Sequence, residues 1–193
     1  MKRVCLLLAD GFEAVEASVF TDVIGWNQIE GDQSTELVTV GTKEILKCTW
    51  NFSVIPEMLI ENLNVDDFDA LAIPGGFEQA GFFKDAYTEE FLNVIREFEK
   101  QGKIIATICV AALVLGKSGI LEGRNATTYN MNPIRQKELT SYKANIVPNQ
   151  AIVVDKNIIT SYNPSTAFDV SFKLLEMLTS VDNTNKVKKL MGF

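Results

Sequence analysis

The sequence contains no histidine. Without an imidazole, the chain cannot by itself build a Ser-His-Asp triad, a Cys-His pair or a histidine-ligated metal site. Any chemistry must therefore use carboxylates, thiols, amines, hydroxyls or backbone groups.

Cysteine is scarce as well, with Cys5, Cys48 and Cys109 as the complete set. Their number is odd and no pair shows CxxC spacing, which argues against a disulfide framework and against a zinc ribbon. We therefore expect no metal and no cofactor.

Long apolar runs and excess positive charge are also missing. Residues 104–116 form the least polar stretch, which is shorter than the roughly 20 residues of a membrane span and includes Thr107. The N-terminus imitates a signal peptide only until Asp10 and Glu13. The formal net charge of −7 disfavours non-specific binding to nucleic acid or anionic membranes. We expect a cytoplasmic protein that binds neither.

Apolar runs alternate with segments of helical period along the 193 residues. This alternation predicts an α/β fold with a doubly wound, mostly parallel sheet and helices on both faces. With no repeat and no linker, residues 1–193 are predicted to form one domain. The expected strands are 2–9, 36–40, 69–76, 103–108, and short ones near 125–129, 144–147, 151–154 and 157–161, and the expected helices are 13–30, 86–100, 109–119 and 165–179.

Cys109 falls where a predicted strand gives way to a predicted helix. A tight strand-to-helix turn resembles the nucleophile elbow of hydrolases, which exposes a reactive side chain above the sheet. A helix N-terminus also stabilises a thiolate, so we expect a thiol pKa below its ordinary value of about 8.5. A cysteine in an apolar run is more often a small core residue, and we keep that interpretation for Cys5 and Cys48.

Glu16 lies within the apolar stripe of the first predicted helix. At 3.6 residues per turn, Glu16 projects between Val23 and Phe20, where a carboxylate is costly unless it is neutral or has a partner. We therefore expect a protonated Glu16 that donates a hydrogen bond to a Cys109 thiolate. Glu13 lies at the edge of the stripe, and we interpret it as a group that complements the helix dipole. The stripe itself comprises Val15, Trp26, Val19, Phe12 and Val23.

Gly75 and Gly76 end the third predicted strand in the sequence "IPGG". Most glycine pairs are only turns, but their flexible backbone can also expose amides to an oxyanion. Because ligands bind at the carboxyl ends of parallel strands, these amides are expected to lie near Cys109.

The segments "ADGFEAVEAS", "LAIPGG", "IATICVAALVL", "ATTY" and "TSYNPSTAFDVSFKLLEML" resemble the ThiJ/PfpI family in order and spacing, over nearly the whole chain. The resemblance implies a flavodoxin-like fold related to class I glutamine amidotransferases, a homodimer, and a reactive cysteine paired with a protonated glutamate. These map onto Cys109 and Glu16, and the oxyanion amides map onto Gly76 and Val110. The pocket is expected to include Gly75, Tyr129, Trp50, Asn163 and Pro164.

Two departures from the family pattern bear on activity. Tyr129 stands where many members carry a histidine, and Trp50 stands near a position where a member carries an arginine. The family's protease-like and glyoxalase-like members generally use a histidine as a proton carrier, which this chain lacks. We therefore expect an aromatic, poorly basic pocket and no protease activity.

Three functions remain open at this point. The first is an enzyme that acts on a small electrophile, as a hydrolase, hydratase or deglycase, with Cys109 attacking and Glu16 moving the proton. Its mechanism would resemble that of the family's isonitrile hydratases, although those use an aspartate. The second is a redox-sensing or stress-protective protein whose Cys109 is oxidised. The third is a ligand-binding or amidotransferase-like domain without turnover.

Overall fold

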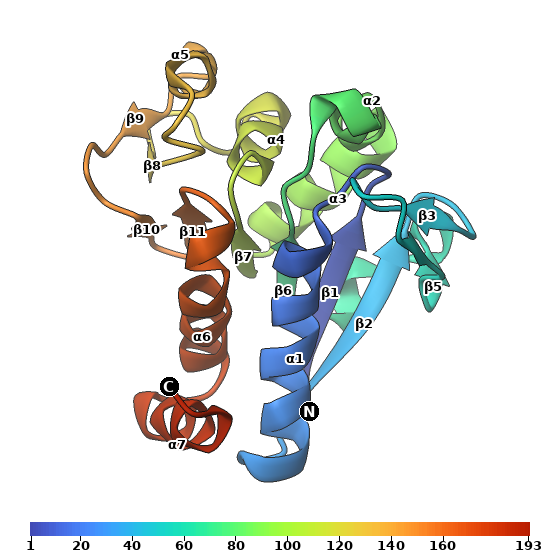
Figure 1. Ribbon diagram of the computed structural model, residues 1–193, viewed down its shortest axis with the longest axis vertical. Helices are drawn as coiled ribbons and strands as arrows, with labels where there is room; N and C mark the ends of the chain where they lie inside the picture. Colours follow the sequence, from blue (N-terminus) through green and yellow to red (C-terminus); the bar gives the residue numbers. More distant parts are fainter.

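A seven-stranded sheet runs through the centre of the computed structural model, which describes residues 1–193 (Figure 1). The strand order is β10-β11-β7-β6-β1-β2-β5, and all neighbours are parallel except the edge pair β10–β11. The predicted doubly wound, mostly parallel sheet is therefore confirmed. The strands are β1 (Lys2–Leu8), β2 (Thr35–Gly41), β5 (Met58–Leu59), β6 (Ala70–Ile73), β7 (Ile104–Thr107), β10 (Ile152–Asp155) and β11 (Ile158–Ser161).

The central strands are buried on both faces, as their continuous apolar sequences predict. One face is covered by α1 (Ala14–Glu30) and α6 (Ala167–Leu178), which lie side by side in Figure 1, with α7 (Val181–Met191) packed beneath them. The other face carries α3 (Glu89–Lys100) and α4 (Ala111–Ser118), preceded by the short α2 (Phe82–Ala86). The buried side chains of both layers join in one hydrophobic cluster.

Small two-stranded sheets and a helix extend this frame. β3 (Leu46–Lys47) pairs with β4 (Ser53–Val54), and β8 (Asn125–Ala126) pairs with β9 (Asn145–Ile146). Between β8 and β9 the chain forms α5 (Pro133–Ser141), which starts at the N-cap Asn132 and has proline at its first position. Neither α5 nor α7 is among the helices predicted from the sequence. None of the helices combines the length and the apolar character that a membrane-spanning segment requires.

The first helix is rotated relative to the predicted stripe. Val15 and Trp26 were expected to face the core, but their side chains are 48% and 36% exposed. The buried face instead contains the polar residues Glu16 and Asn27. Asn27 can be buried because its amide donates to Thr35 and its oxygen accepts from Asn183 on α7.

Candidate active site

The candidate site lies where the direction of winding reverses. From β1 the chain proceeds outward to β2 and β5, then crosses to β6 on the opposite side of β1 and continues to β7 and β11. Neighbouring strands whose connections leave in opposite directions form a crevice at their carboxyl ends, which is where open α/β sheets bind ligands. The segments that follow β1, β6 and β7 meet here, as the sequence predicts.

Cys109 occupies the sharp turn between β7 and α4. Its φ angle is +58°, a left-handed conformation that is uncommon for a residue other than glycine. Strain of this kind persists only where the surrounding structure holds it. Thr128 is one such support, because its hydroxyl donates to the Cys109 carbonyl oxygen at 2.9 Å. The geometry agrees with the predicted elbow.

Glu16 lies beneath the turn and is completely buried. Its Oε2 accepts a hydrogen bond from the Gly75 amide at 2.6 Å, whereas Oε1 has no hydrogen-bond partner. Burial, reinforced by the negative charge of Glu13, raises the pKa of Glu16 to about 8. The raised pKa favours the neutral form of Glu16 at pH 7, and Oε1 is the oxygen without a hydrogen-bond partner.

The thiol itself departs from expectation. Burial raises the pKa of Cys109, and the Glu16 carboxylate, when ionised, raises this pKa further. The Val110 amide lowers the thiol pKa, as a helix N-terminus should, but does not outweigh burial. The prediction of a lowered thiol pKa is thus wrong, because burial outweighs the helix N-terminus and favours the neutral thiol.

Two glycines allow close packing of the backbone here, Gly75 against Glu16 and Cys109, and Gly76 against the loop after β1. A Cβ added to Gly75 would lie 2.9 Å from Glu16 Oε2 and 3.1 Å from Cys109 Cβ. A Cβ added to Gly76 would lie 2.3 Å from the Gly11 carbonyl oxygen. The Gly76 amide donates none of the backbone hydrogen bonds found outside helices and strands. It is therefore available to an incoming oxyanion, together with the Val110 amide.

A cavity of about 290 Å³ opens above Cys109. Four of the expected residues, Gly76, Val110, Tyr129 and Pro164, line it with Cys109. Gly75 does not line the cavity, but its amide donates a hydrogen bond to Glu16. A volume near the lower end of ligand-site sizes suits a small molecule. The remaining lining residues are Glu13, Phe77, Glu78, Gln79, Asn132 and Arg135.

Trp50 and Asn163 do not line this cavity. Trp50 is 68% exposed and borders a neighbouring hollow, where its ring lies 5.5 Å from that of Phe77. Asn163 precedes a short helical turn and bonds to Asn130. Both positions came from sequence resemblance, which does not resolve the direction of a side chain on a loop.

Two charged residues of the cavity were not predicted as site residues: Glu13 was assigned to the helix dipole, and Arg135 was not considered. Glu13 is half-buried, acts electrostatically on both Glu16 and Cys109, and has a pKa raised by burial. Arg135 comes from α5, the helix that sequence reasoning did not find. The cavity therefore contains one cation, in contrast to the expectation of a poorly basic pocket. No group of three or more metal-ligating side chains occurs.

Comparisons with known proteins identify the family and the fold. The model of the DJ-1/PfpI family matches residues 2–177. Protein DJ-1alpha of Drosophila melanogaster is 32% identical over 98% of this chain and 83% of its own length. The glutathione-independent glyoxalase DJ-1 of Schizosaccharomyces pombe is 30% identical over 100% and 99%. The crystal structure of Drosophila melanogaster DJ-1beta superposes with a TM-score of 0.86 at 26% identity, covering 98% of this chain and 97% of that one, which confirms the flavodoxin-like fold.

Proposed function

Because the chain belongs to the DJ-1/PfpI family, we propose that it is an enzyme that uses Cys109 to convert small reactive carbonyl compounds, with glyoxals as the substrate class. The observation that carries the proposal is a thiol on the wall of a small cavity that Glu13 also lines, with the completely buried Glu16 carboxyl group beside the thiol. Glu16 is protonated, whereas Glu13 is more accessible to solvent and serves as the ionised carboxylate. Such a pair supplies an acid and a base without histidine. The relative named as a glyoxalase gives independent support for a glyoxal substrate.

The first step joins the substrate to the enzyme. The sulfur of Cys109 bonds to the aldehyde carbon as the carbonyl π bond breaks, and the thiol proton passes to Glu13. The developing oxyanion is held by the Gly76 and Val110 amides and takes the proton of Glu16. The product is a neutral hemithioacetal. The two carboxyl groups have exchanged protonation states: Glu13 is now protonated and Glu16 is ionised.

The next steps rearrange the adduct and release it. Glu16 removes the hydrogen of the former aldehyde carbon, the electron pair forms an enediol, and Glu13 protonates the second oxygen. Glu16 then returns its proton to the second carbon while the first hydroxyl loses a proton to Glu13, which leaves a thioester. Water attacks this thioester with Glu16 as base, and the departing sulfur takes the proton from Glu13. A 2-hydroxy acid leaves and both carboxyl groups regain their starting protonation.

The test is lactate formation from methylglyoxal by homogeneous protein. Cys109→Ala should abolish turnover, and Glu13→Gln should lower kcat by a factor on the order of 10² or more, as loss of a proton carrier does. Cys48→Ala removes a buried thiol outside the cavity and should leave turnover within about twofold. Activity that survives in Cys109→Ala would contradict the proposal. A wild type that shows no turnover but whose Cys109 is oxidised by mild peroxide would favour redox sensing instead.

We further propose that the protein acts as a homodimer. Alongside the family resemblance, support comes from the apolar side chains of Val15, Trp26 and Ile29, which α1 presents to solvent. Exposed apolar groups of this kind on one element are typical of a contact surface. Light scattering after size exclusion should give twice the chain mass, and Ile29→Asp should shift the population toward monomer.

A further inference from the structure

Glu78 and Arg135 both line the Cys109 cavity and are joined by an ion pair of 2.8 Å. They are 57 residues apart in the sequence and belong to different segments: Glu78 follows β6, and Arg135 lies in the first turns of α5. Glu78 is 64% exposed whereas Arg135 is 20% exposed, and Cys109 is deeply buried. Both side chains thus belong to the cavity wall, and Glu78 is the more solvent-exposed of the two.

Arg135 is fixed from three directions. Its second guanidinium nitrogen donates to Glu138 at 3.0 Å, and its planar group lies 4.9 Å from the centre of the Phe83 ring. Glu138 is itself held by the Tyr87 hydroxyl at 3.2 Å. A guanidinium with two carboxylate partners has its positive charge offset, and two of the N–H donors of Arg135 are already in use.

The charge balance of the cavity follows from these contacts. Its charged lining residues are Glu13, Glu78 and Arg135, and Glu138 contacts Arg135 from the side. Two carboxylates compensate Arg135, so Glu13 remains as the charge without an ion-pair partner in the cavity. An anionic group beside the sulfur would meet a negative carboxylate and a cation that is already paired.

We propose that the Glu78–Arg135 pair is a specificity element that restricts the cavity to electrophiles without negative charge, such as neutral dicarbonyls as opposed to 2-oxo acids. Glu78 has this effect because its ion pair with Arg135 prevents the guanidinium from binding an anionic substrate. The proposal rests on the proposed function only in treating the Cys109 cavity as the substrate site. It concerns which electrophile reaches the sulfur, not the steps that follow.

Alkylation of Cys109 tests this without turnover. Iodoacetamide and iodoacetate deliver the same electrophilic carbon, neutral in one case and anionic in the other. The second-order rate of each would be measured at Cys109 by mass spectrometry, and each rate would be divided by that of free cysteine. For the wild type, the normalised rate with iodoacetate should be well below the rate with iodoacetamide.

Glu78→Gln should raise the iodoacetate rate about three- to tenfold, the range expected for one unit of charge in a partly screened cavity, and should leave the iodoacetamide rate within about twofold. Glu122→Gln is the matched control. Glu122 is 61% exposed and forms a 2.7 Å ion pair with Lys143. It does not line the cavity, and its substitution gives the same change in net charge. It should alter neither rate.

The double variant Glu78→Gln/Arg135→Met distinguishes two explanations of a faster iodoacetate reaction: attraction of the anion by Arg135 freed from Glu78, and the mere removal of one negative charge. If Arg135 captures the anion, the gain in iodoacetate rate should be lost in this variant. A gain that persists there, or equal wild-type rates with both reagents, would overturn the proposal. If the wild type does not turn over methylglyoxal but its Cys109 still reacts more slowly with iodoacetate than with iodoacetamide, the proposed function alone would be wrong. If Cys109 reacts with neither reagent, the proposed function and the specificity proposal would both be wrong.

Discussion

At the scale of single residues, the chain keeps a carboxyl group in its core at the expense of apolar side chains. Glu16 is completely buried while Val15, its neighbour in the sequence, is half exposed. Burial of an ionised carboxylate without a partner is costly, so the group remains neutral and bonds to the Gly75 amide. This arrangement couples the proton of Glu16 to folding.

The coupling predicts how stability depends on pH. The unfolded chain releases the Glu16 proton above about pH 4.5, whereas the folded chain keeps it up to about pH 8. Between these values the unfolded state binds fewer protons, so the free energy of unfolding falls as pH rises, by up to about 1.4 kcal/mol per unit. Glu16→Gln removes this dependence. From pH 5 to 7.5 the wild type should lose about 3 kcal/mol more than the variant.

Urea unfolding at several pH values measures this difference. Glu30→Gln, an exposed carboxylate at the end of the same helix, serves as the control and should follow the wild type. Parallel curves for the wild type and Glu16→Gln would show that Glu16 is ionised in the folded protein. The proposed acid role of Glu16 would then be wrong.

Residue patterns predicted part of this site and not the rest. Cys109, Glu16 and the glycine pair could be chosen because each breaks a local rule: a polar group in an apolar stripe, or a special backbone at a strand end. Glu13 has an ordinary alternative role at a helix start, and Trp50 was placed by resemblance alone. Whether such side chains face the cavity depends on packing that no local spacing encodes.

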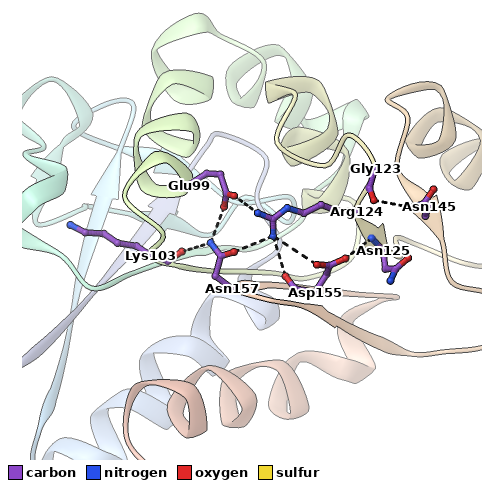
Figure 2. A network of polar contacts seen from close by, with 8 residues as sticks. All are labelled: Glu99, Lys103, Gly123, Arg124, Asn125, Asn145, Asp155 and Asn157. Carbon is purple, nitrogen blue, oxygen red and sulfur yellow. Dashed lines mark hydrogen bonds and ion pairs between the residues drawn. The ribbon is translucent and has the colours of Figure 1, made fainter.

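At the scale of elements, a polar network joins three segments at the edge of the sheet (Figure 2). Arg124, just before β8, pairs with Glu99 on α3 and donates to the Asp155 carbonyl oxygen at 3.2 Å. Asn157 bonds to Glu99 at 2.8 Å and to the Lys103 carbonyl oxygen at 2.8 Å. The network anchors the start of the segment that leads to Thr128 and Tyr129 at the active site.

Arg124→Met should therefore cost more than loss of a surface ion pair. Glu99 and Asp155 are each about four-fifths buried, and both would lose their cationic partner. We expect a decrease of about 2 kcal/mol in the free energy of unfolding, the scale of hydrogen bonds to charged groups. Lys143→Met, which breaks the exposed pair with Glu122, should change stability by less than about 0.5 kcal/mol. Equal effects in urea unfolding would contradict an anchoring role.

The elements that sequence patterns missed are those with little apolar surface. Leu139 is the one buried residue of α5, and α7 buries only Thr184 and Val187. With so few core contacts, α5 shows no clear apolar stripe, and the stripe of α7 is set in a mostly polar sequence. Their boundaries were nevertheless encoded: Asn132 and Ser180 cap them through side-chain hydrogen bonds. Capping signals would have located α5, and with it Arg135.

At the scale of the whole molecule, the site depends on the winding of the sheet. Residues 13, 76 and 109 are far apart in the sequence and meet because β1, β6 and β7 are neighbours whose ends share one edge. The strand alternation predicts this meeting, since parallel strands bring their carboxyl ends together. The pattern does not predict the size of the cavity, which is set by α5 and the loop after β6.

That size, together with the missing imidazole, predicts the absence of proteolysis. Hydrolysis of a peptide bond needs an acid that protonates a poor amine leaving group, a role worth on the order of 10²–10⁴ in rate. The imidazolium that usually does this in cysteine proteases is absent from this chain and from an identical partner. Glu13 and Glu16 carry protons to a carbonyl oxygen and a thiolate in the proposed cycle, and neither task involves an amine leaving group. The cavity of about 290 Å³ has the size of a small-molecule site and is too small for an extended polypeptide. Homogeneous protein should release no fragments from casein, as measured by mass spectrometry. Cleavage that disappears in Cys109→Ala would mean that Glu16 can protonate an amine and that the cavity wall opens.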